Sequence, residues 1–317
     1  MSADMEQSKV VMTQDRGSSS GSVTALTSKL IDYAGLFPPA KLDMPTTLSN
    51  YASYLACDEA WMLGRLIVPA GRLDEFELCA ASFLSHEDGA EPWRISCLTA
   101  PAGDEQLAAD LDRITIFNHE HASNKAGLAM IDVIELRGDS PQHIDSALDL
   151  IPDELYAFVE MPVDHDPRGL IAAMAGGDAG AKVRTGGVTA DAFPSPTNLA
   201  RFICACASAH VPFKATAGLH HPLRHHNDTV AAKMFGFLNV FVGGCLAYES
   251  SLDEETLREL LIDEASDSFD FTADRVAWHD HTLRIAQITD ARDHFAVSFG
   301  SCSFDEPRDD LRKLNLL

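Results

Sequence analysis

Eight short runs rich in β-branched and aromatic residues recur along the chain, separated by amphipathic segments with helical spacing. Strands that alternate with helices pair in parallel and are joined by right-handed crossovers. Eight such units in 317 residues favour a closed (β/α)8 TIM barrel over an open doubly wound sheet. The predicted strands are 30–33, 63–68, 93–98, 131–136, 155–160, 181–184, 212–216 and 295–300, and the predicted helices are 47–60, 73–84, 104–119, 141–150, 167–175 and 196–209.

Two regions fall outside this repeat. Residues 1–22 are polar and end in a serine- and glycine-rich stretch, which predicts a disordered tail before a single barrel domain over 23–317. A long interval between the last two strands predicts a helical insertion at about 226–292, suited to a lid or to a contact in a homo-oligomer. Within it we expect an apolar helix at 228–248, an acidic helix at 253–263, a hairpin at 269–278 and a helix at 282–292.

The charge balance limits the partners. Lys and Arg number 24 against 48 Asp and Glu, a formal net charge of −24, which repels nucleic acid and anionic membrane surfaces. A small anionic substrate would therefore need a local gathering of basic residues. Seven cysteines without a pairing pattern, and no apolar leader, predict a cytoplasmic protein without a disulfide framework.

Charged side chains gather at the ends of the predicted strands, where a barrel places its active site. In an acidic chain, Arg65, Lys182, Arg184 and Lys214 form a concentrated positive field. The same charges could instead neutralise one another as a structural network. The predicted catalytic residues are Lys214, Lys182, Asp132, Glu135 and Glu160. The predicted substrate-binding residues are Asp32, Arg65, Arg184 and Thr216, with Gly186, Gly187, Gly300, Ser301 and Ser303 in loops that expose backbone N–H groups.

Lys214 faces the barrel interior in this prediction, because Phe213 and Ala215 alternate with it along the strand. Burial and a nearby cation, either Lys182 or Arg184, would lower its pKa and make it a nucleophile. Asp132, Glu135 or Glu160 would then carry protons. Strand alternation puts Asp132 and Glu135 on opposite faces, so both point inward only if the strand contains a bulge.

Four stretches resemble the class I aldolase barrels of the deoxyribose-phosphate aldolase type: 30–38, 131–134, 214–218 and 299–303. The resemblance implies that Lys214 forms a Schiff base, that Lys182 is its helper and that Asp132 assists proton transfer. It also implies that residues 299–303 bind a phosphate. In that family the Schiff-base lysine precedes its helper, whereas the better-matching lysine here comes second.

Two other classes of function stay open. His220, His221, His225 and His226 lie in one loop after the seventh strand and could hold Zn or another divalent metal for a hydrolase or isomerase. Alternatively, the barrel is catalytically silent and serves as a binding protein. The imine mechanism itself requires no cofactor.

Overall fold

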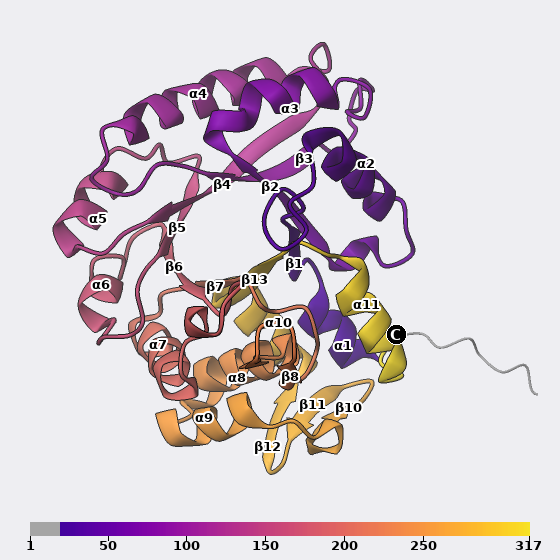
Figure 1. Ribbon diagram of the computed structural model, residues 1–317, viewed down its shortest axis with the longest axis vertical. Coiled ribbons are helices and arrows are strands. Elements are labelled where there is room, and N and C mark those ends of the chain that lie inside the picture. Colours follow the sequence, from indigo (N-terminus) through magenta and orange to yellow (C-terminus); the bar gives the residue numbers. More distant parts are fainter. Residues whose placement is uncertain (1–19) are drawn as a thin grey trace, which may run out of the picture.

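In the computed structural model, which describes residues 20–317, eight parallel strands close into a barrel (Figure 1). Their order around the barrel is β1-β13-β7-β6-β5-β4-β3-β2, so the TIM-barrel prediction is confirmed. All eight predicted strands occur within two residues of their expected ends. They are β1 (Ile31–Tyr33), β2 (Leu63–Pro69), β3 (Trp93–Leu98), β4 (Ala129–Arg137), β5 (Tyr156–Glu160), β6 (Ala179–Arg184), β7 (Phe213–Thr216) and β13 (Ala296–Ser301).

Helices surround the barrel (Figure 1). Apolar side chains of the strands and of these helices are buried together in one core. Helix α7 shows the local reasons for this pattern: Ser195 caps its N-terminus, Pro196 occupies the first turn, and Phe202 and Ile203 are buried. No helix within residues 20–317 is long and apolar enough to cross a membrane. The six helices predicted between strands are α2 (Met44–Leu55), α3 (Leu73–Ala80), α4 (Gln106–His121), α5 (Pro141–Leu148), α6 (Arg168–Ala172) and α7 (Pro196–Ala209).

The interval between β7 and β13 is less helical than predicted. The expected helix at 228–248 begins only at Phe237, because the residues before it form the hairpin of β8 (His225–Asn227) and β9 (Ala232–Met234). Gly236 marks the change, since a Cβ there would lie 2.3 Å from the Pro222 carbonyl oxygen. The remaining elements are α8 (Phe237–Ser250), α9 (Glu254–Ile262), β10 (Phe269–Phe271), β11 (Arg275–Trp278), β12 (His281–Arg284) and α10 (Ile285–His294).

Helix α8 is almost entirely buried and packs between α7 and α10. It therefore serves as the barrel helix that follows β7, and only the elements around it are additions. The predicted helix at 282–292 starts late for a similar reason, because residues 281–284 pair with β11 in a three-stranded sheet. The acidic helix is confirmed as α9.

The N-terminal boundary is also different. Helix α1 (Gly21–Thr27) begins inside the predicted disordered tail, with Ser20 as its cap. The Ser22 hydroxyl donates to the Thr272 carbonyl at 2.7 Å, and α1 packs against α10. The prediction of disorder is therefore wrong for residues 20–22, and its part over 1–19 lies outside the described residues. The sequence pattern also missed α1 and the last helix, α11 (Asp305–Lys313).

Phe213 anchors the outer face of β7. Its ring stacks on Phe241 of α8 at 5.9 Å and meets Phe202 of α7 and Phe295 edge-on. Because neighbouring residues of a strand face opposite sides, this packing turns Lys214 into the barrel. The aromatic cluster thus determines where the functional side chain points.

We expect Phe213→Ala to lower the free energy of unfolding by about 3–5 kcal/mol, because the cavity it leaves is lined by rings of three elements. Leu78→Ala is the matched control: Leu78 is 85% exposed, so its change should stay within about 0.5 kcal/mol. Urea unfolding measures both. Equal losses for the two variants would contradict the role given to Phe213.

Candidate active site

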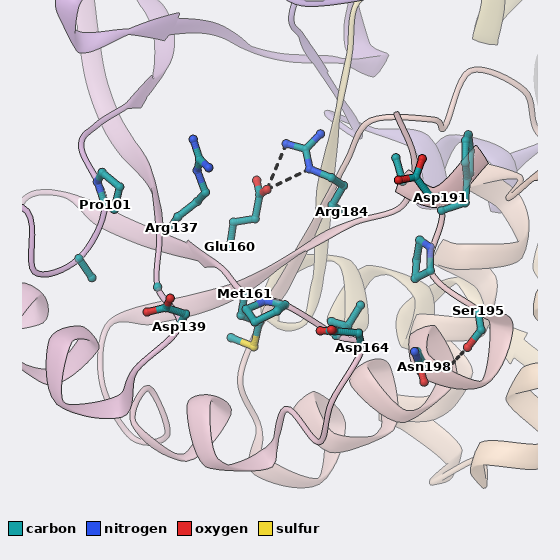
Figure 2. Close-up of a pocket in the computed structure, with 17 residues that line it drawn as sticks. Pro101, Arg137, Asp139, Glu160, Met161, Asp164, Arg184, Asp191, Ser195 and Asn198 are labelled. Atoms are coloured by element: carbon teal, nitrogen blue, oxygen red, sulfur yellow. Dashed lines mark hydrogen bonds and ion pairs between the residues drawn. The ribbon is translucent and has the colours of Figure 1, made fainter. Parts of the chain in front are cut away.

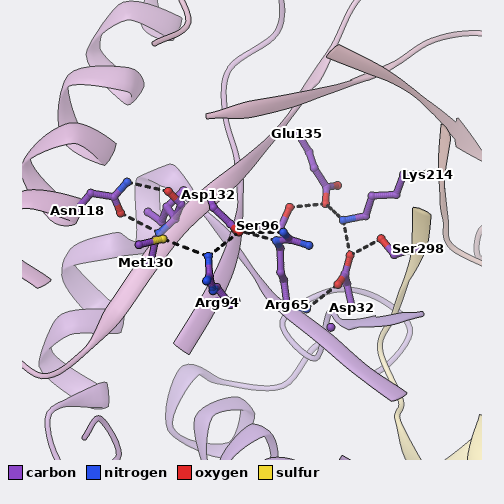
Figure 3. A network of polar contacts seen from close by, with 12 residues as sticks. Asp32, Arg65, Arg94, Ser96, Asn118, Met130, Asp132, Glu135, Lys214 and Ser298 are labelled. Atoms are coloured by element: carbon purple, nitrogen blue, oxygen red, sulfur yellow. Dashed lines mark hydrogen bonds and ion pairs between the residues drawn. The ribbon is translucent and has the colours of Figure 1, made fainter. Parts of the chain in front are cut away.

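Lys214 lies at the centre of the barrel between two carboxylates (Figure 3). Its Nζ is 2.6 Å from Asp32 Oδ2 and also contacts Glu135 Oε1. Each of these three side chains is only 1% exposed. Two hydroxyls complete the surroundings: Ser298 donates to Asp32 at 2.7 Å and Ser96 donates to Glu135 at 2.7 Å.

Lys182 continues this arrangement on the neighbouring strand. Its Nζ lies 2.7 Å from Glu135 Oε2 and 2.7 Å from Glu160 Oε2, and Glu160 Oε1 accepts from Arg184 at 3.1 Å. The charges therefore alternate in an unbroken series. We call this the ionic chain, and its members are Asp32, Lys214, Glu135, Lys182, Glu160 and Arg184.

The ionic chain shifts the pKa values of its members. Burial by itself raises the pKa of Glu135, but the ammonium groups of Lys182 and Lys214 outweigh it and hold that pKa well below the ordinary range. Burial likewise raises and Lys182 and Arg184 lower the pKa of Glu160, with a net lowering. For Lys182, burial lowers the pKa, while Glu135 and Glu160 raise it above the ordinary value.

This electrostatic result corrects one expectation. The sequence predicted that a nearby cation, either Lys182 or Arg184, lowers the pKa of Lys214. Glu135 instead lies between Lys182 and Lys214 and contacts both ammonium groups. The carboxylate replaces repulsion by attraction, and Lys182 is therefore protonated at neutral pH in the free protein.

A cavity of about 640 Å³ opens over the carboxyl-terminal ends of β4, β5 and β6 (Figure 2). Glu160 and Arg184 line it, so the ionic chain reaches the cavity at one end. Arg137, the last residue of β4, also lines the cavity. So do Ser195 and Asn198, which lie at the N-terminus of α7. Arg137 directly follows the predicted strand 131–136, but it was not among the predicted site residues.

Asp132 and Arg65 lie elsewhere than predicted. Arg65 is the third residue of β2, and its Nε donates to Asp132 Oδ1 at 2.7 Å, while Arg94 contacts Asp132 Oδ2 at 3.0 Å. All three belong to the N-terminal halves of their strands, away from the cavity. The pairing of β3 with β4 skips Asp132, which is the bulge that strand alternation required. The prediction that Asp132 carries protons for the lysines is therefore wrong. Arg65 does not lie at the carboxyl-terminal end of its strand, where it was expected to bind substrate.

Asp32 is another correction, because it is fully buried beside Lys214 and is not positioned to touch a substrate at the strand ends. Its second oxygen accepts from the Arg65 backbone N–H at 2.6 Å. Both oxygens of this carboxylate thus accept hydrogen bonds within the barrel, and Asp32 positions the Lys214 ammonium group.

The loop residues predicted to bind an anion have other neighbours. A Cβ on Gly218 would lie 3.0 Å from the Gly186 Cα, so the loops after β6 and β7 cross closely there. Ser301 donates to the Ser303 carbonyl at 2.7 Å, and Ser303 Oγ accepts from the backbone of α11. Gly187, Gly300 and Thr216 likewise do not line the cavity. Anion binding by these residues stays a prediction.

Two of the four histidines, His220 and His221, connect the loop after β7 to α11. His220 Nδ1 is 2.9 Å from Glu306, His221 contacts Asp310, and the ring of His225 packs edge-on against His221. His226 is exposed beside Asp228. In residues 20–317, no three His, Cys, Asp or Glu side chains are placed to share a metal ion. Of the four histidines considered as alternative metal ligands, His220 and His221 instead contact carboxylates of α11 and fasten the loop.

Comparisons with known proteins add little. No protein-family model matches the sequence, and no curated protein matches it. Among solved structures, a mandelate oxidase variant with 4-Br-2-hydroxy-methylphenylacetate is similar over 85% of this chain and 76% of its own, with 11% identity and a TM-score of 0.33. A similarity this low carries no functional argument. The class is defined by the molecule itself: a (β/α)8 barrel with a buried ionic chain that ends at a cavity.

We expect Glu135→Gln to lower the free energy of unfolding by about 3–5 kcal/mol, because it leaves two buried ammonium groups without their shared partner. The control is Arg168→Gln, which breaks an exposed pair with Asp166 and should leave the urea midpoint unchanged. Unfolding in urea at pH 7 measures both. A near-neutral Glu135→Gln would show that the ionic chain does not stabilise the fold.

Stability should also depend on pH in a defined way. Glu135 and Glu160 have lowered pKa values, so their contribution is present above the unfolded-state value of about 4.3 and is lost as pH falls through the folded values. The raised pKa of Lys182 gives a contribution that is complete below about 10.4 and is lost as pH rises through its folded value. Urea midpoints between pH 2 and 11 should therefore fall at both extremes, and Glu160→Gln should flatten the acid side.

Proposed function

We propose that this barrel is a carbon–carbon lyase of the aldolase type that acts on a small anionic carbonyl compound through a lysine imine. The observation that supports it best is the pair of buried lysines joined by Glu135, with one end of the ionic chain at a cavity. Barrels place their chemistry at this end of the strands.

Lys182 is better placed than Lys214 to be the nucleophile. Lys182 contacts Glu160, which lines the cavity, whereas Lys214 lies deeper and is held by Asp32 and Glu135. This exchanges the two roles expected from the sequence. It also gives the lysine order of the aldolases that the chain resembles, in which the Schiff-base lysine comes first.

The proposed reaction starts from deprotonated Lys182. Its Nζ attacks the carbonyl carbon, the oxygen is protonated and leaves as water, and the C=N bond of the iminium forms. A base then removes the proton of the β-hydroxyl, and the C–C bond breaks to release an aldehyde. The electron pair of the broken C–C bond moves into the iminium and gives an enamine. Glu160, 2.7 Å from Lys182 Nζ, is the group that accepts and returns these protons.

The raised pKa of Lys182 has a consequence for the rate. Only a small fraction of Lys182 is neutral at pH 7. As long as the pH is below the pKa, each rise of one pH unit increases that fraction about tenfold. The role of Lys214 is then to hold Glu135 in place by ion pairing.

No arrangement of the four histidines favours the metal-dependent alternative.

The test is reduction with borohydride in the presence of glyceraldehyde or succinic semialdehyde, followed by peptide mapping. We expect an adduct on Lys182, lost in Lys182→Met, with a trapping rate that rises up to about tenfold per pH unit between pH 7 and 9. Lys233→Met, which removes an exposed lysine paired with Glu264, is the control and should change nothing. A folded protein that traps no carbonyl compound on Lys182 would rule out the imine.

A further inference from the structure

Arg137 is an unpaired cation in the wall of the cavity. Its side chain is exposed, and within residues 20–317 its guanidinium makes no ion pair. Figure 2 shows it beside Glu160, with Arg184 on the other side of that carboxylate. Arg184 is already engaged by Glu160. In a chain with a net charge of −24, an arginine without a carboxylate partner is a candidate receptor for a ligand anion.

The charges around Arg137 favour a single negative charge on that ligand. Besides Glu160, three carboxylates line the cavity: Asp139, Asp164 and Asp191. These would repel a phosphate dianion more strongly than a monoanion. A planar carboxylate carries one charge and matches the two-pronged donor geometry of a guanidinium.

The remaining wall is suited to a carbon chain. Met161, Val163, Phe193 and Pro194 line the cavity between the charged groups. Strand pairing places Arg137 opposite Glu160, and Glu160 opposite Lys182, so Arg137 and Lys182 are two strands apart. Two strand spacings amount to about 10 Å, which the long side chains shorten. A carbonyl at Lys182 and an anion at Arg137 are therefore separated by several bonds.

We propose that the substrate is an oxo acid whose carboxylate is bound by Arg137 while its carbonyl carbon reacts at Lys182. This rests on the proposed function and specifies its substrate class. Arg137 is then the residue that selects acids over neutral carbonyl compounds. Arg184 keeps its place in the ionic chain and orients Glu160.

The experiment compares succinic semialdehyde with butanal, its uncharged counterpart of equal chain length, in borohydride trapping at Lys182. We expect Arg137→Gln to slow trapping of the semialdehyde at least about tenfold and to leave butanal unchanged. Arg168→Gln, outside the cavity, should affect neither compound. A variant that slows both equally, or neither, overturns the assignment.

Trapping with glyceraldehyde 3-phosphate shows whether Arg137 prefers a phosphate or a carboxylate. If it is trapped faster than the semialdehyde and Arg137→Gln removes that advantage, Arg137 is a phosphate receptor and the oxo-acid proposal is wrong. Calorimetric titration with succinate tests Arg137 without any imine: wild type should bind it, and Arg137→Gln at least about tenfold more weakly. If Arg137→Gln weakens succinate binding but wild type traps no carbonyl compound on Lys182, only the imine is refuted. If wild type traps the semialdehyde on Lys182 but Arg137→Gln binds succinate as well as wild type does, only the role of Arg137 is refuted.

Discussion

The structure depends on one buried carboxylate, Glu135, that contacts two buried ammonium groups. Each of these three charges is unfavourable alone in an apolar interior, and Glu135 stabilises both ammonium groups while they stabilise Glu135. They come from β4, β6 and β7, so they meet only when the sheet is closed in the correct register. Asp32 and Glu160 extend the pairing and Arg184 ends the series, so that three carboxylates are matched by three cations.

The packing outside the barrel maintains this geometry inside it. Phe213 fixes the direction of Lys214 through the aromatic residues of α7 and α8, and Thr185 fastens the loop after β6 by donating to the Thr216 carbonyl at 3.2 Å. Histidines of the loop after β7 pair with carboxylates of α11. The elements between β7 and β13 thus complete and support the barrel wall next to the lysines.

The same ionic chain links stability to the proposed chemistry. Carboxylates that stabilise Lys182 also keep it protonated, so a strongly paired lysine is a slow nucleophile until a proton is removed. Glu160 is the carboxylate of the ionic chain that lines the cavity, and in the proposed mechanism it exchanges protons there. Among residues 20–317, Arg137 makes no ion pair. In the proposed substrate complex it therefore separates substrate recognition from the charges that hold the fold together.

The sequence alone determined the eight strands, the barrel and the inward direction of Lys214, because alternation of residues along a strand and alternation of strands with helices are local patterns. It left open whether Asp132 or Glu135 faces the barrel interior. It also placed Glu160 and Arg184 at strand ends. Tertiary structure alone decided that Glu135 lies between the lysines, that a bulge turns Asp132 toward Arg65, and that residues before Phe237 form a hairpin. These outcomes depend on the register between strands and on contacts between distant segments, which no local pattern contains. For the same reason the sequence could place Arg137 next to a predicted strand end, but only the folded barrel put it beside a cavity with no ion pair among residues 20–317.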